Sequence, residues 1–465
     1  TFGDHSLNLL AGHEYYRYKY NYALGEKTGI VGGIDELGPA VTTTDNNSYS
    51  HNYGVESYLA RINYGFKSRY YIDASWRTDG SSRFHPSDRW GHFWSVGASW
   101  RISEEQFMEN TRQWLDNLTL KVSYGVQGND NLGTYYAWQG LYDYTWPNAT
   151  DAGAFVDKLE NRKVTWEKNG NLNAGIEATM FGGRLGVSVE YYNRKTRDML
   201  LNSPLPISTG FTGFNDNVGS LRNQGLEVSL RGTILDKRDF RWDATLMSSF
   251  NRNKVLSLTG GQDVITSGIR VIEVGRPIYT FYLPKTAGVD PATGKQLYYA
   301  YWTQTVNDEG ALVNTRCDEY ITDNVAMATL SKYYHESREP KLFGSIGSTF
   351  TILKNIDFSF LTTYSIGGWV YDGLYNGSMY VQYAGNNWHK NAKRRWQKPG
   401  DKTDVPMLEV GGSYATASNS LIDASYFAIK NITVGYTLPK RWLKKIDIES
   451  LRIYATFDNI AMFNH

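Results

Sequence analysis

Apolar and polar residues alternate with a period of two through most of the chain, and this pattern constrains the fold more than any other feature. The clearest segments are 70–77, 94–102, 118–126, 171–178 and 356–364. In residues 118–126 every second residue is apolar or aromatic: Leu118, Leu120, Val122, Tyr124 and Val126. Successive side chains of a β-strand point to opposite faces, so the pattern predicts strands with one apolar face.

The length of these segments separates two kinds of β protein. We count roughly thirteen segments, many of about nine residues or more. Strands of soluble proteins usually span about 5–6 residues, whereas a tilted transmembrane strand needs about 9–11. Trp94 and Trp100 lie about 20 Å apart on one face, at about 3.3 Å per residue. This spacing is typical of an apolar band edged by two aromatic girdles.

The connections between the segments alternate in length. Tight turns are predicted near 67–69, 181–184, 236–239 and 353–355. Two links of intermediate length cover 103–117 and 438–449. The long polar connections are 19–54, 79–90, 128–170, 197–223, 253–340 and 367–424. With the intermediate links counted as short, short and long connections alternate throughout. An up-and-down barrel collects its short turns on one rim and its long loops on the other, and a β-sandwich has no reason to keep that order. The sequence therefore predicts an all-β, transmembrane, antiparallel up-and-down β-barrel in the outer membrane.

Composition excludes several other classes. With 48 Lys+Arg against 47 Asp+Glu, the chain has no charge excess for nucleic acid or for anchoring to a membrane surface. The single cysteine, Cys317, excludes an internal disulfide framework. The eight histidines have no metal-ligand spacing, and we expect His85 and His92, which flank Trp90, to have a surface or stacking role. No metal, no cofactor and no catalytic residues are predicted.

Several motifs resemble the SusC-like branch of TonB-dependent transporters, in matching order over nearly the whole chain. One is the strand-end segment 124–133, which includes Gly128-Asn129-Asp130. The others are 204–227, 274–294 with Val274-Gly275-Arg276-Pro277-Ile278, 340–344 and 423–436. The resemblance implies a barrel of about 22 strands, plugged by an N-terminal domain driven by TonB and covered by a SusD-like lipoprotein. It also allows a dimer of transporter–lipoprotein pairs.

On this resemblance, residues 1–465 are the C-terminal portion of such a barrel. The extracellular loops are expected at about 19–54, 128–170, 197–223, 253–340 and 367–424. The plug is expected to lie outside this sequence, which begins without an initiator Met. About thirteen strands also conflict with the even strand number of single-chain barrels. Because unpaired strand edges are costly in lipid, we expect further strands to complete the barrel.

One loop offers a candidate ligand site: Trp388, His389, Arg394, Arg395 and Trp396. Trp and Arg suit stacking on a sugar face or holding a polar peptide. The alternative is that these residues pack against neighbouring loops or against the SusD-like lipoprotein. The predicted function is TonB-dependent import of a glycan or an oligopeptide, with no enzymatic step. The alternatives are a secreted all-β carbohydrate-active enzyme and a passive porin or adhesin. On strand 118–126 we expect Leu120 and Val122 to face lipid, and Lys121 and Ser123 to face the lumen.

Overall fold

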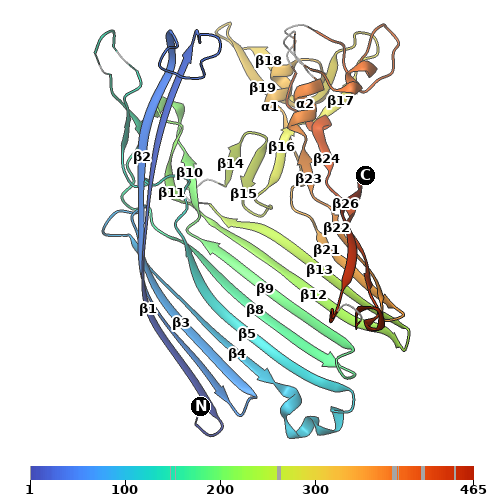
Figure 1. The fold of residues 1–465 in the computed structure, drawn as a ribbon. Helices are drawn as coiled ribbons and strands as arrows, with labels where there is room; N and C mark the ends of the chain where they lie inside the picture. The colour runs from blue at the N-terminus through green and yellow to red at the C-terminus, as the bar shows by residue number, and fades with distance from the viewer. Residues whose placement is uncertain are drawn as a thin grey trace. The chain divides into compact units, whose positions relative to one another are not determined.

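The main element of the chain is a sheet of thirteen strands (Figure 1). The computed structural model describes residues 2–146, 148–151, 153–258, 263–379, 385, 387–409, 414–444 and 447–464. The strand order is β1-β2-β3-β4-β5-β8-β9-β12-β13-β21-β22-β25-β26. Each strand pairs with the next one along the chain in this set, as in an up-and-down barrel, and the number of strands agrees with the sequence prediction.

The strands of the main sheet are long. Their bounds are β1 (His5–Thr28), β2 (Thr42–Phe66), β3 (Tyr70–Ser81), β4 (Trp90–Arg101), β5 (Leu115–Asn129), β8 (Glu167–Met180), β9 (Leu185–Arg197), β12 (Ser220–Lys237), β13 (Phe240–Ser257), β21 (Leu342–Ile352), β22 (Ile356–Ile366), β25 (Tyr426–Thr437) and β26 (Arg452–Asn464). Every one reaches the length that a tilted transmembrane strand needs. In the part of the chain that the structure describes, no helix is long and apolar enough to cross a membrane.

The chain divides into two compact units, which we describe separately. The first comprises Thr1–Arg112, Asn117–Ile176 and Tyr192–Arg222. The second comprises Gln113–Asp116, Glu177–Tyr191 and Asn223–His465.

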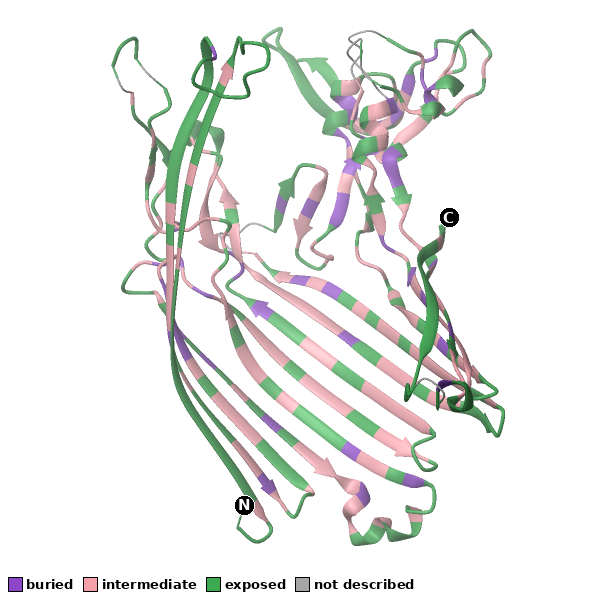
Figure 2. Ribbon diagram, in the orientation of Figure 1, coloured by how far each residue is buried: buried purple, intermediate pink, exposed green. Residues whose placement is uncertain are grey.

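In the first unit, the alternation produces one continuous apolar face. The register places Ala74 opposite Val96, Val96 opposite Tyr124, and Ala98 opposite Val122. Val96 and Val122 are each 47% exposed, and few residues of these strands are buried (Figure 2). Apolar rows that are left uncovered across several strands suit contact with lipid rather than water.

The opposite face of the same strands is polar. Ser75 and Ser95 are register partners, and their Oγ atoms are 2.7 Å apart. Lys121 and Ser123 pair with Ser99 and Gly97 on this face. The predicted division of β5 into an apolar and a polar face is confirmed, and the assignment of lipid and lumen to these faces stays a prediction.

The short connections lie where the sequence placed them. The turns cover 67–69, 181–184, 238–239 and 353–355. The turn after β8 contains Gly182 and Gly183 at φ +63° and +81°, a left-handed backbone that favours glycine. The intermediate links, 102–114 and 438–451, contain short helices: η1 (Ile102–Glu104), η2 (Gln106–Thr111) and α3 (Lys440–Leu443).

One predicted loop is wrong. Residues 19–54 are not a polar connection, because β1 and β2 pair from His5 and Phe66 as far as Thr28 and Thr42. The chain leaves the strands only over residues 29–41. Strand β2 pairs with β3 only from Val55 to Phe66. The outer parts of β1 and β2 therefore form a two-stranded ribbon beyond the end of β3 (Figure 1).

Four of the other long connections, 128–170, 197–223, 253–340 and 367–424, contain short strands and helices. They contain β6 (Leu141–Asp143), β7 (Phe155–Lys158), β10 (Leu200–Pro204), η3 (Ile207–Thr209), β11 (Gly213–Asn217), β14 (Val264–Ser267), β15 (Arg270–Glu273), β16 (Thr280–Pro284), β17 (Thr286–Val289), β18 (Gln296–Val306), β19 (Leu312–Thr322), α1 (Val325–Leu330), β20 (Lys332–Ser337), β23 (Trp369–Tyr371), α2 (Gly373–Met379), η4 (Lys390–Arg394), η5 (Ser418–Ser420) and β24 (Leu421–Asp423). Two of the additional sheets have the strand orders β14-β15-β16-β20 and β17-β18-β19.

Residues of the connections form apolar cores. In the first unit, Phe84 and Val164 are fully buried in one cluster with Trp166 and with Phe93 of β4. In the second unit, Leu283 is buried with Phe281 and Leu421. A folded connection holds polar and aromatic side chains in fixed positions, which an unstructured loop does not do.

Candidate functional site

The five residues predicted to bind ligand lie in the connection between β22 and β25, within the second unit. Two of them are engaged with neighbouring loop segments. The Trp396 indole donates from Nε1 to the Pro291 carbonyl (3.0 Å) and lies against Gly294, where a side chain would collide with the ring. Arg394 forms an ion pair with Asp404 (3.1 Å). These contacts correspond to the alternative interpretation, in which the residues pack the loops together.

The other three differ in their surroundings. His389 caps η4, where its Nδ1 accepts a hydrogen bond from the Asn391 amide (3.2 Å), and its ring meets Tyr375 edge-on at 4.9 Å. Trp388 is 37% exposed. Trp388 and Arg395 line the same small cavity of about 10 Å³, which has room for a single water. Of the five, Trp388 and Arg395 are the two whose side chains form no hydrogen bond or ion pair with other described residues, and their role as ligand contacts stays a prediction.

A larger cleft lies in the same unit, and sequence reasoning missed it. It has a volume of about 670 Å³. Its lining includes residues from the segment before β16, the link between β16 and β17, β20, the start of β23 and η5: Arg276, Lys285, Tyr334, His335, Trp369 and Ser418. We call it the Arg276 cleft. The only signal in the sequence was the motif that includes Gly275-Arg276-Pro277, which carried the family resemblance without indicating a site.

Burial determines the protonation state of His335, the histidine of the Arg276 cleft. Desolvation lowers the pKa of His335 below its ordinary value, so the ring is neutral near pH 7. Its Nε2 lies 3.2 Å from the Leu283 carbonyl, which can only accept, so Nε2 carries the proton and donates it. The positive charge in the cleft therefore comes from Arg276 and Lys285.

The polar face of the sheet in the first unit lines a second open cavity, of about 480 Å³. Its polar lining residues come from β3, β4, β5 and β8: Asp73, Ser75, Ser95, Ser123, Asn171 and Asn173. The lining also includes residues of the apolar face, among them Trp94, Val96 and Tyr124, so the cavity is not bordered by polar groups alone.

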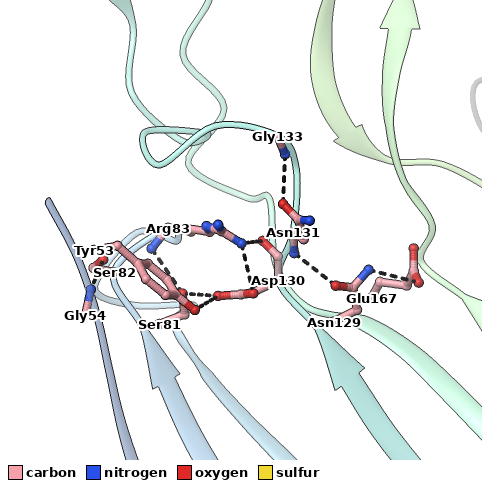
Figure 3. Close-up of polar contacts among 10 residues, drawn as sticks. All are labelled: Tyr53, Gly54, Ser81, Ser82, Arg83, Asn129, Asp130, Asn131, Gly133 and Glu167. Carbon is pink, nitrogen blue, oxygen red and sulfur yellow. Dashed lines mark hydrogen bonds and ion pairs between the residues drawn. The ribbon is translucent and has the colours of Figure 1, made fainter. Parts of the chain in front are cut away.

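A polar network holds the connection after β5 in place (Figure 3). The Asp130 carboxylate pairs with Arg83 (3.1 Å) and accepts hydrogen bonds from Tyr53 Oη (2.8 Å) and Ser81 Oγ (2.7 Å). The side chains of Arg83 and Asp130 are only 12% and 14% exposed. The guanidinium also lies over the Tyr53 ring, 4.5 Å from its centroid. Asp130 belongs to the strand-end motif of residues 124–133, so this motif anchors a connection to β2 and β3.

The β1–β2 ribbon carries a ladder of aromatic rings. The paired positions on one face are Tyr18 with Tyr53, Tyr20 with His51, and Tyr22 with Tyr49. Tyr135 from the connection after β5 adds its ring, 5.3 Å from His51 and 5.8 Å from Tyr53. A two-stranded ribbon is marginally stable alone, and cross-strand aromatic pairs contribute roughly 0.2–1 kcal/mol each. The ladder therefore stabilises the ribbon.

The features that could suggest metal chemistry have other roles. His85 bonds to Ser87 (2.7 Å) and meets Trp138 edge-on, and His92 stacks on Trp76, as predicted. Asp290 accepts hydrogen bonds from the Ala292 amide and Thr293 within a tight turn. Across the described residues, no three His, Cys, Asp or Glu side chains are grouped as metal ligands.

Comparison with known proteins gives a consistent result. The family model described as TonB dependent receptor-like, beta-barrel matches residues 1–460. TonB-dependent receptor P26 of Formosa agariphila is 28% identical, over 99% of this chain and 47% of its own length. TonB-dependent receptor SusC of Bacteroides thetaiotaomicron is 29% identical, over 89% of this chain and 41% of its own.

A solved structure of the RagAB peptide transporter superposes with a TM-score of 0.82 at 29% identity, over 99% of this chain and 50% of that one. The chain thus spans about half the length of the relatives it matches.

Proposed function

The chain belongs to the TonB-dependent receptor β-barrel family of the bacterial outer membrane, and on that premise we propose that it takes part in active import of a glycan or an oligopeptide. The partners in this proposal are TonB, acting through a plug domain, and a SusD-like surface lipoprotein. The relatives are receptors and transporters, so the chain is not an enzyme.

The match of residues 1–460 to the barrel family is the observation that carries the proposal. The structure supports it through two opposed faces. Apolar side chains such as Val96 and Val122 are exposed on one face, where lipid would cover them. Serines and asparagines of the other face contribute hydrogen-bonding groups to an open cavity, along which a polar cargo could pass. A secreted soluble enzyme would leave the apolar face in water, at a high cost in solubility.

In this proposal the folded connections capture the cargo before transport. Trp388 and Arg395 are the candidates for first contact, because Trp396 and Arg394 are already used within the loops. An indole offers an apolar face for a sugar ring or a peptide side chain, and a guanidinium offers directed donors for its polar groups. No bond is made or broken in the cargo.

The proposal includes two classes of cargo, a glycan and an oligopeptide, and one experiment distinguishes them. Cells that carry the intact gene and cells from which it is deleted are given isotopically labelled oligosaccharides in one arm and labelled oligopeptides in the other. The proposal predicts that deletion abolishes accumulation of one of these classes. Equal accumulation of both classes in both strains would contradict the import function.

A further inference from the structure

The Arg276 cleft presents one guanidinium in a fixed position with its outer edge free. The Nε of Arg276 donates to Glu273 Oε2 (2.7 Å), and the guanidinium carbon lies 3.7 Å from the centroid of the Tyr334 ring. The side chain is still 42% exposed. Among the described residues, no side chain or carbonyl bonds to the two terminal nitrogens. A guanidinium held in this way can grip a planar anion with two parallel hydrogen bonds.

A second cation borders the same cleft. The Nζ of Lys285 lies 4.4 Å from the centroid of Tyr299 and 5.8 Å from that of Tyr333. No carboxylate of the described chain lies within ion-pair distance of this ammonium. The rings orient the ammonium without neutralising it, because a cation–π contact leaves the charge in place. Lys285 is therefore available to an anion from outside.

The rest of the lining limits what can bind. Glu336 is the only carboxylate among the described lining residues, and Glu273, outside the lining, forms an ion pair with Arg276. Ser418 Oγ lies 3.1 Å from the Thr286 amide and 3.2 Å from its hydroxyl. Trp369 supplies an apolar side to the cleft. This combination suits one negative group on a larger, partly apolar molecule better than a multiply charged ion.

We propose that Arg276 and Lys285 form a carboxylate-binding subsite for the cargo, resting on the proposed import function. A carboxylate matches the planar edge of the guanidinium, and Lys285 adds a second positive charge. The carboxylate can belong to an acidic sugar or to the end of a peptide, and the chemistry of recognition is the same for both.

The test uses calorimetry with the protein purified from its native outer membrane. The probes are an N-acetylated tripeptide with a free C-terminal carboxylate, the same tripeptide as its amide, a galacturonate trimer, and the methyl ester of that trimer. We expect one of the two acids to bind at least tenfold more tightly than its neutral form. The acid that shows this preference identifies the source of the carboxylate.

Two variants and one control assign the effect to the cleft. Arg276→Gln should remove the preference for the acid, and Lys285→Met, at an exposed position, should reduce it by a smaller factor. Arg270→Gln is the matched control, because Arg270 also lies over a tyrosine ring (Tyr279, 5.6 Å) but does not line the cleft. Retention of the heat-modifiable barrel band on gels shows that each variant is folded.

Several outcomes would overturn the subsite. These are equal affinity of the wild type for acid and neutral forms, binding of neither acid, or equal losses in the Arg276→Gln and Arg270→Gln variants. If cells still accumulate the cargo in any of these cases, the subsite is wrong and the import function stands. If cells accumulate no cargo, the import function itself fails.

Discussion

An arginine placed at two neighbouring positions of β5 tests the two-faced sheet most sharply. Val122 lies on the apolar face opposite Ala98, between the levels of Trp94 and Trp100, and is 47% exposed. Ser123 lies on the polar face opposite Gly97, and a Cβ at Gly97 would come within 2.5 Å of the Asp73 carboxylate. An arginine at position 123 would therefore enter the cavity on the polar face beside a carboxylate, whereas an arginine at position 122 would enter lipid.

The expected costs differ strongly. Arginine near the middle of a lipid-facing strand destabilises a barrel by about 2–4 kcal/mol, and by much less at a lumen position. At about 1.4 kcal/mol per tenfold change, Val122→Arg should lower the ratio of folded to unfolded protein roughly 30- to 700-fold.

The assay is the yield of the heat-modifiable folded band in outer-membrane fractions, with Val122→Ile as the control for a change of side chain alone. Ser123→Arg and Val122→Ile should remain close to wild type. Equal losses for Val122→Arg and Ser123→Arg would show that the assignment of the two faces is wrong.

Three further predictions concern the connections and the partner. Breaking the Arg83–Asp130 pair with Arg83→Met should destabilise its surroundings by about 3 kcal/mol, which would appear as faster proteolysis at residues 130–140. The double variant Arg83→Met with Asp130→Leu should recover part of this loss. Unchanged proteolysis in Arg83→Met would rule out an anchoring role. Trp388→Ala should weaken cargo binding about tenfold in calorimetry, a loss of about 1.4 kcal/mol, whereas Trp396→Ala should loosen the loop. If Trp396→Ala weakened cargo binding and Trp388→Ala loosened the loop, the two roles would be exchanged. Purification from the native membrane in mild detergent should co-isolate a SusD-like lipoprotein, and recovery of the barrel alone in several detergents would contradict that partner.

The strands could be predicted because apolar and polar residues alternate along segments that are long enough to cross a membrane. Segment 118–126 lies within β5, and 356–364 lies within β22. The β1–β2 ribbon was missed because its aromatic residues, such as Tyr18 and Tyr20, alternate with Lys19 and Asn21 in a run that is polar overall. The ribbon is held by aromatic pairing rather than by burial of aliphatic side chains.

The folded connections and their cleft could not be predicted in the same way. Strands such as β17 and β23 have four and three residues, too few for alternation to be recognised. Lys285 and Ser418 meet in the Arg276 cleft although 133 positions separate them (418 − 285). The contact of Trp396 with the turn at Gly294 is equally non-local. From the sequence, the loop with Trp and Arg could be proposed as a site. The sequence could not show which of these side chains already contact neighbouring loop segments.

Energy dependence of uptake tests the central claim most directly. The measurement is accumulation of the labelled cargo in intact cells, with and without a protonophore, and in a strain that lacks TonB. An active importer predicts accumulation above the external concentration in energised cells, and its loss in both other conditions. Uptake that equilibrates at the external concentration and is unaffected by either treatment would identify a passive pore and contradict the proposed function.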